Sequence, residues 1–127
     1  MSVTLSADGL SKRLSIEQFK NFLLRAVMQY LTKDCHELEF KQEAENSLWV
    51  GCKSLWSRGC WFSFSDNGVS CITYSGRSPA DMALQDVAVH ELVKKYGGTV
   101  FDPQNYVIHK YDTRVKDWIY EKFNQFN

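Results

Sequence analysis

The segment that most constrains the fold runs from residue 47 to residue 75, where three of the four tryptophans and three of the four cysteines lie. Apolar and polar residues alternate over short stretches of it, which is typical of half-buried strands. In residues 60–65 the alternation places Cys60, Phe62 and Phe64 on one face and Trp61 on the other. We therefore expect large apolar side chains on both faces of this part of a sheet.

The flanking residues extend this segment to a four-stranded antiparallel meander. Strands are predicted over residues 36–42, 48–54, 60–65 and 69–74. Between the last two, Asn67-Gly68 is typical of a type I′ hairpin turn, whose two central residues need positive φ. A second hairpin is predicted from residues 99–101 and 106–110.

Three helices are predicted around these strands. Ser15 and Gln18 have the spacing of a capping box at the start of the first helix, which should end near Lys33. The second should run from an N-cap at Ser78 to a left-handed glycine at Gly97, and the third should begin near residue 112. The predicted order is α-β-β-β-β-α-β-β-α, which indicates an α+β fold with a four- to six-stranded antiparallel meander sheet packed by three helices.

Length and charge narrow the class of protein. A chain of 127 residues has the usual size of one domain, so we expect residues 1–127 to form a single α+β domain, with residues 1–11 loosely ordered. Fifteen basic residues balance fifteen acidic ones, which argues against broad nucleic-acid binding. Because no apolar run is long enough to span a membrane and no signal peptide is visible, the sequence predicts a cytoplasmic protein with no membrane association.

The cysteines do not indicate a metal or catalytic site. Their spacings contain no C-x-x-C pair and no nearby histidine at zinc-ligand spacing, so no metal and no cofactor is predicted. Buried free thiols are expected. Because Cys60 and Cys71 flank one predicted hairpin, the sequence leaves open whether they ever form a disulfide.

The histidines offer the only alternative with catalytic chemistry. His90 or His109, acting with Asp86 or Asp102, would be the acid–base pair of a small hydrolase or nuclease. No recognisable motif surrounds either histidine, and a solvated pair one helical turn apart explains Asp86 and His90 equally well. We therefore predict that the protein is not an enzyme and that it binds another protein.

Two surface groups are the candidates for partner binding. The first is acidic and lies on the first predicted strand of the meander and in the turn after it, where it would attract a basic partner or simply form the solvated edge of the sheet. The second lies in the turn before residue 60 and carries tryptophan and arginine, the residues most enriched in binding hot spots. The candidate residues are Glu37, Glu39, Glu43, Glu45, Trp56 and Arg58.

The segment from Val93 to Gln104, VKKYGGTVFDPQ, resembles one found in small bacterial immunity proteins, where a helix ends in Gly-Gly and a strand runs into an Asp-Pro turn. This resemblance implies a cytoplasmic protein that binds and neutralises a cognate toxin domain. The order of elements also resembles that of class I type III secretion chaperones, which bind an effector segment. Those chaperones are generally acidic, whereas this chain has zero net charge.

Overall fold

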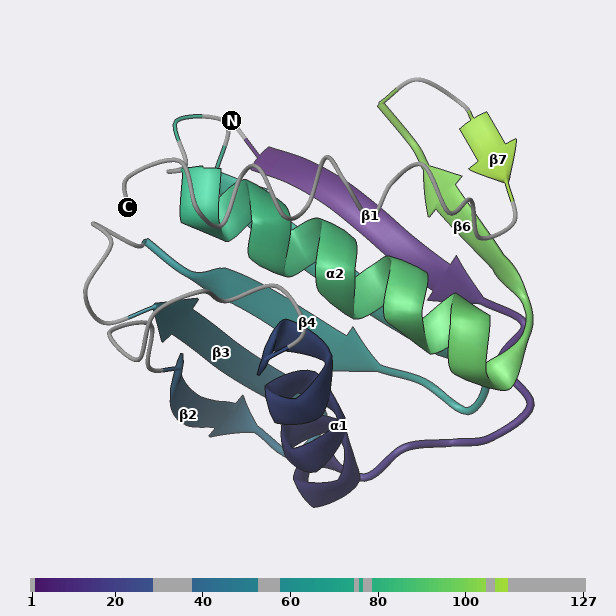
Figure 1. The fold of residues 1–127 in the computed structure, drawn as a ribbon, viewed down its shortest axis with the longest axis horizontal. Helices are drawn as coiled ribbons and strands as arrows, with labels where there is room; N and C mark the ends of the chain where they lie inside the picture. Colours follow the sequence, from purple (N-terminus) through teal and green to yellow (C-terminus); the bar gives the residue numbers. More distant parts are fainter. Residues whose placement is uncertain are drawn as a thin grey trace.

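The computed structural model of the chain describes residues 2–28, 38–52, 58–74, 76, 79–104 and 107–109. These residues have an α+β architecture in which two helices lie on one side of a single antiparallel sheet (Figure 1). The helices are α1 (Ile16–Met28) and α2 (Pro79–Tyr96). The strands are β1 (Ser2–Asp8), β2 (Leu38–Ala44), β3 (Ser47–Cys52), β4 (Cys60–Phe64), β5 (Gly68–Tyr74), β6 (Thr99–Asp102) and β7 (Val107–His109).

The predicted meander and second hairpin are confirmed within one seven-stranded sheet of order β2-β3-β4-β5-β1-β6-β7. The meander occupies four adjacent positions, and β6 pairs with β7. The capping box of α1 is also confirmed: the Ser15 N–H donates to Gln18 Oε1 over 3.0 Å, and the Gln18 N–H donates to Ser15 Oγ over 3.1 Å. Gly97 ends α2 with a φ of 78° and donates its N–H to the Val93 carbonyl.

The prediction for residues 1–11 is wrong, because residues 2–8 form a strand in the interior of the sheet. Strand β1 pairs with β5 along its whole length and with β6 through three residue pairs. It thereby joins the meander to the second hairpin. The order of elements consequently starts with a strand and not with a helix, and the sheet has seven strands instead of four to six. The helix predicted from residue 112 lies outside the described residues.

The hairpin between β4 and β5 is present, but its turn differs from the prediction. The Ser65 N–H donates to the Gly68 carbonyl over 3.0 Å, which leaves Asp66 and Asn67 at the tip. Gly68 already belongs to β5 and is not among the glycines with positive φ. A Cβ on Gly68 would lie 3.0 Å from the Ala7 carbonyl oxygen. The close approach of β1 therefore explains this glycine better than a type I′ turn does.

The hydrophobic core lies between the sheet and the two helices. Phe19 of α1 is fully buried, and its ring centroid lies 4.8 Å from that of Phe62 and 5.0 Å from that of Phe64, both on β4. Each buried phenylalanine contributes about 2–3 kcal/mol to folding through burial of apolar surface. Helix α2 is fixed to the sheet by buried Gln85, whose amide donates to the carbonyls of Val3 and Cys71.

Candidate functional site

Among the described residues, both helices lie on one side of the sheet; we call the opposite side the helix-free face, and it presents large side chains in register. Because Phe62 faces α1, the neighbouring Trp61 must project from the other side of β4. Trp61 pairs directly with Trp49 on β3 and with Ile72 on β5, so all three share this face. Tyr74 follows two residues after Ile72, and its ring meets that of Trp61 edge-on at 5.3 Å. The result is a continuous aromatic and aliphatic surface across three strands.

This surface is partly open to solvent. Ile72 is 38% exposed and Tyr74 is 45% exposed, whereas Trp49 and Trp61 are half-buried. Trp61, Ile72 and Tyr74 also line a shallow hollow of about 260 Å³ together with Ser2. Large apolar side chains that remain exposed in register on one face are more typical of a binding surface than of an ordinary solvated sheet.

Arg58 lies at the edge of the helix-free face in a backbone corner that four hydrogen bonds fix. The fully buried carboxylate of Asp81, in the first turn of α2, accepts from the N–H groups of Arg58 and Gly59 at 2.9 and 3.1 Å. Trp49 Nε1 donates to the Arg58 carbonyl over 3.0 Å, and Thr73 Oγ1 donates to the Gly59 carbonyl over 3.0 Å. A Cβ on Gly59 would lie 2.2 Å from Trp49 Nε1, so this corner requires glycine.

The fixed corner brings Arg58 to the aromatic surface. Its guanidinium carbon lies 5.8 Å from the centroid of the Tyr74 ring, within the range of a cation–π contact. The backbone that carries Arg58 is therefore held in place before any partner arrives. Such preorganisation lowers the entropic cost of binding.

The structure does not gather the predicted acidic residues into one cluster. Glu39, Glu43 and Glu45 are exposed, but Glu39 lies near the start of edge strand β2 and Glu45 lies in the turn after it. Six residues of extended chain separate these two by about 20 Å. Glu39 pairs with Gly51, next to the Lys41–Trp49 pair on the helix-free face. Glu45 instead lines a hollow of about 330 Å³ that also contains Arg13 and Glu17. Glu37 and Trp56 lie outside the described residues.

None of the four residues of the aromatic surface is among the predicted binding residues. The sequence places Trp49, Trp61, Ile72 and Tyr74 in predicted strands, without a functional role. The signal that identifies them is the alternation along these strands, which required large apolar groups on both faces of the meander. Only the position of the helices decides which of the two faces stays open.

The hydrolase or nuclease alternative needs a histidine that a substrate can reach, and His90 does not meet this need. His90 is 3% exposed, and its Nδ1 lies 2.8 Å from the Asp86 carbonyl oxygen within α2. A catalytic base must reach its substrate, and this imidazole is enclosed by the fold. The side chain of His109 lies outside the described part of the chain. Among the described residues, no group of three or more histidine, cysteine or acidic side chains is placed to hold a metal ion.

Three thiols lie buried on the helix side of the sheet. Cys52, Cys60 and Cys71 are all free, so the described structure contains no bond between Cys60 and Cys71. Burial, followed by the nearby charge of Asp81, raises the pKa of Cys52 from 9.0 to about 12. Burial, followed by a hydrogen bond with Cys60, also raises the pKa of Cys71 well above 9.0.

We expect these thiols to be unreactive in the folded protein. At pH 8 a thiol with a pKa of about 12 is ionised in only about one molecule in ten thousand, and the thiolate is the reactive form. Treatment with Ellman's reagent, followed by peptide mass analysis, should modify Cys52 and Cys71 only after denaturation. Rapid modification of either residue in the folded protein would contradict their burial.

The same shifts make folding stability depend on pH. Because the folded protein holds the Cys52 proton more tightly than the unfolded chain does, the stabilisation is complete below pH 9.0 and is lost as pH rises toward about 12. Each such thiol lowers the free energy of unfolding by up to about 1.4 kcal/mol per pH unit in that window. A Cys52→Ser variant should show a shallower decline of stability at alkaline pH.

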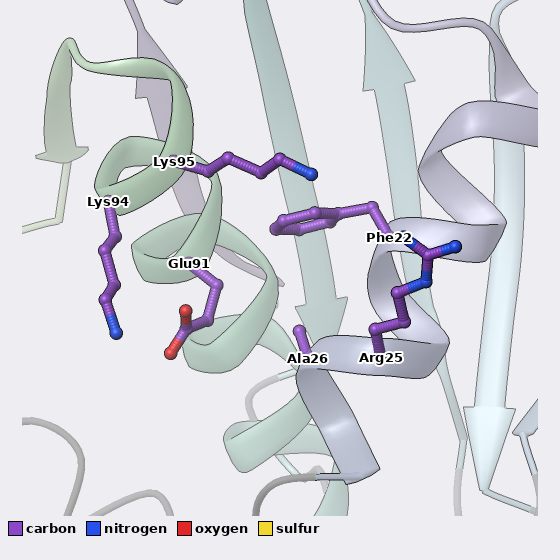
Figure 2. A pocket seen from close by; sticks show the side chains of 6 residues that line it. All are labelled: Phe22, Arg25, Ala26, Glu91, Lys94 and Lys95. Atoms are coloured by element: carbon purple, nitrogen blue, oxygen red, sulfur yellow. The ribbon is translucent and has the colours of Figure 1, made fainter.

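A further hollow lies on the helix side of the sheet, between the two helices (Figure 2). We call it the interhelical groove; its volume is about 340 Å³, and it is lined by Phe22, Arg25, Ala26, Glu91, Lys94 and Lys95. The basic side chains are exposed, whereas Glu91 is buried. None of these residues was a predicted binding residue, because the groove exists only where α1 and α2 meet.

Comparison with known proteins adds no family to this description. No protein-family model matches the sequence, and no curated protein shows significant similarity to it. Within the described residues, neither helix has the length and apolar character that crossing a bilayer requires.

Proposed function

We propose that this chain is a non-catalytic protein-binding module that binds a cognate bacterial toxin domain through its helix-free face and neutralises it. The observation that carries the proposal is the open strip of Trp61, Ile72 and Tyr74, with Arg58 held at its edge. Tryptophan, tyrosine and arginine are the residues that contribute most to protein–protein binding when they anchor an interface.

The dimensions of the face suit a protein partner. The five adjacent strands β2, β3, β4, β5 and β1, about 4.8 Å apart and about 20 Å long, present about 500 Å² on this face. This is the larger part of the roughly 800 Å² that each partner contributes to a stable interface of standard size. By contrast, the hollow at Tyr74 has a volume of only about 260 Å³, below the usual range for small-molecule sites.

The identity of the partner rests on two further features. Residues 93–104 resemble a segment of bacterial immunity proteins, which act in the cytoplasm on a toxin domain. Exposed Glu39 and Glu43 lie on edge strand β2, which β3 separates from the aromatic strip, and would favour a partner with a basic surface. The chaperone alternative was based on an order that starts with a helix, whereas the described chain starts with a strand.

The experiment that tests this proposal is a binding measurement with the neighbouring gene product. An immunity gene should follow a toxin gene directly, so we would purify the inactivated toxin domain and titrate it with this chain by calorimetry. We expect a dissociation constant below about 1 µM, equivalent to a binding free energy of about 8 kcal/mol. No heat of binding at micromolar concentration, with both proteins folded, would contradict the proposal.

Charge reversal on β2 should weaken this binding. We expect the Glu39→Lys/Glu43→Lys variant to lose about tenfold in affinity, mainly through slower association, and to lose its dependence on salt. Its unfolding transition should be unchanged, because both side chains are exposed. The control is Glu17→Lys on α1, which reverses an exposed charge on the helix side and also breaks the ion pair of Glu17 with Lys20. Equal losses in the two variants would exclude β2 from the interface.

A further inference from the structure

The interhelical groove combines an aromatic floor with basic side chains from two elements. Phe22 and Ala26 come from α1, and the Phe22 ring packs at 6.2 Å from the ring of Tyr96 at the end of α2. Figure 2 shows the amino group of Lys95 above the Phe22 ring and the Arg25 side chain extending along α1 toward Phe22. The Lys95 ammonium lies 5.8 Å from the centre of that ring.

The charge at the mouth of the groove is positive although the whole chain has no net charge. Arg25, Lys94 and Lys95 are exposed, whereas the carboxylate-bearing Glu91 is only 6% exposed. An approaching ligand therefore meets three cations at the surface and the acidic side chain only deeper in the wall. This distribution attracts negative charge to the groove.

Helix termini alone do not explain this arrangement. The last turn of a helix favours basic side chains, which accounts for Lys94 and Lys95 at the end of α2 and for Arg25 near the end of α1. It does not account for an apolar floor of Phe22 and Ala26 between cations that come from two different helices. A partly exposed aromatic ring between exposed cations can contact an apolar side chain and carboxylates of the same ligand.

We propose that the interhelical groove binds an acidic peptide segment of a protein partner, with carboxylates at Arg25 and Lys95 and an apolar side chain over Phe22 and Ala26. A compact anion would use the cations but leave the apolar floor uncovered, so the peptide matches more of the groove. The groove lies on the opposite side of the sheet from the helix-free face. Its occupation therefore goes beyond the toxin-binding proposal and does not depend on it.

The test uses the full isotope-labelled chain and an acetylated, amidated Glu-Leu-Glu-Leu-Glu peptide as probe. At about 1 mM peptide, a site with a millimolar dissociation constant is half occupied. We expect amide shifts in residues 21–26 and 91–96 and none in the meander strands. A Lys-Leu-Lys-Leu-Lys peptide should cause none of these shifts, and inorganic phosphate at equal charge should cause much smaller ones.

Paired variants then test the cations. Arg25→Gln/Lys95→Gln should raise the dissociation constant of the acidic peptide about tenfold, because it removes two surface charge contacts. Lys41→Gln, which removes an exposed cation on the helix-free face, should leave it unchanged. The proposal is overturned if the acidic peptide causes no shifts, if phosphate matches it, or if the double variant binds as the wild type does. If the double variant does not fold, the titrations of the wild-type chain with the two peptides and with phosphate still test the proposal.

Discussion

Replacing Gly98 with alanine should destabilise the protein by about 3 kcal/mol or more, because two costs add. Gly98 has a φ of 93°, a conformation that residues with a Cβ rarely adopt. An added Cβ would also lie 2.2 Å from the Asp8 carbonyl oxygen and 3.0 Å from the backbone of Gly9. Both obstacles are backbone atoms, so relief requires β1 and β6 to separate where Asp8 pairs with Thr99.

The adjacent glycine supplies the matched control. Gly97 has a φ of 78°, but an added Cβ would meet no atom within 4 Å. Gly97→Ala therefore carries only the conformational cost, about 1–2 kcal/mol. Equilibrium unfolding in urea should show Gly98→Ala as clearly the less stable of the two variants. Equal destabilisation of the two variants would mean that the close approach of β1 is not the reason why residue 98 is a glycine.

Removing the exposed side chains of the aromatic strip should cause the largest loss of partner binding. We expect the Ile72→Ala/Tyr74→Ala variant to bind the toxin domain about 100-fold more weakly, a loss of about 2.7 kcal/mol, which is typical of a hot spot. The change removes the ring that contacts Trp61 and Arg58. Calorimetry with the purified toxin domain measures the change directly.

The control for this variant lies on α1. Leu24 is 40% exposed and Met28 is 73% exposed, so Leu24→Ala/Met28→Ala removes a comparable amount of exposed apolar surface from the helix side. We expect this variant to retain wild-type affinity. A similar loss of affinity in both variants would show that binding responds to general destabilisation and not to contact with the helix-free face.

The elements predicted correctly were those with local signals. The capping box at Ser15 and Gln18, the glycine at Gly97 and the alternation in β4 all act within a few residues, so the sequence shows them directly. Such local patterns strongly restrict the backbone conformation, because residues at helix caps and turns form hydrogen bonds with backbone groups only a few positions away.

Strand β1 was missed because its stabilisation is non-local. Its partners in β5 and β6 are sixty or more residues away in the chain, as the pairs Ser6–Ser70 and Ser6–Phe101 show. Val3, Leu5 and Ala7 do alternate with polar residues, and the last two are buried. That alternation was the available signal, but its small side chains made it weak.

The candidate site was predicted only in part, because its residues are also brought together by contacts between distant parts of the chain. Arg58 belongs to the site through a corner held by Asp81, a residue more than twenty positions away, and no local pattern links the two. The predicted acidic group extends beyond β2, and most of the length of this extended strand separates Glu39 from Glu45. Ile72 and Tyr74 are exposed because both described helices pack against the opposite side of the sheet. The alternation of apolar and polar residues along the strands does not determine which side the helices cover.

The most direct test of the central claim is hydroxyl-radical footprinting of the chain with and without the toxin domain. This method measures solvent access to aromatic and sulfur side chains and needs no mutation. Binding through the helix-free face predicts that Trp61 and Tyr74 become protected in the complex, while Met28 and Tyr96 on the helix side keep their reactivity. Protection of Met28 and Tyr96, with Trp61 and Tyr74 unchanged, would contradict the proposed binding face.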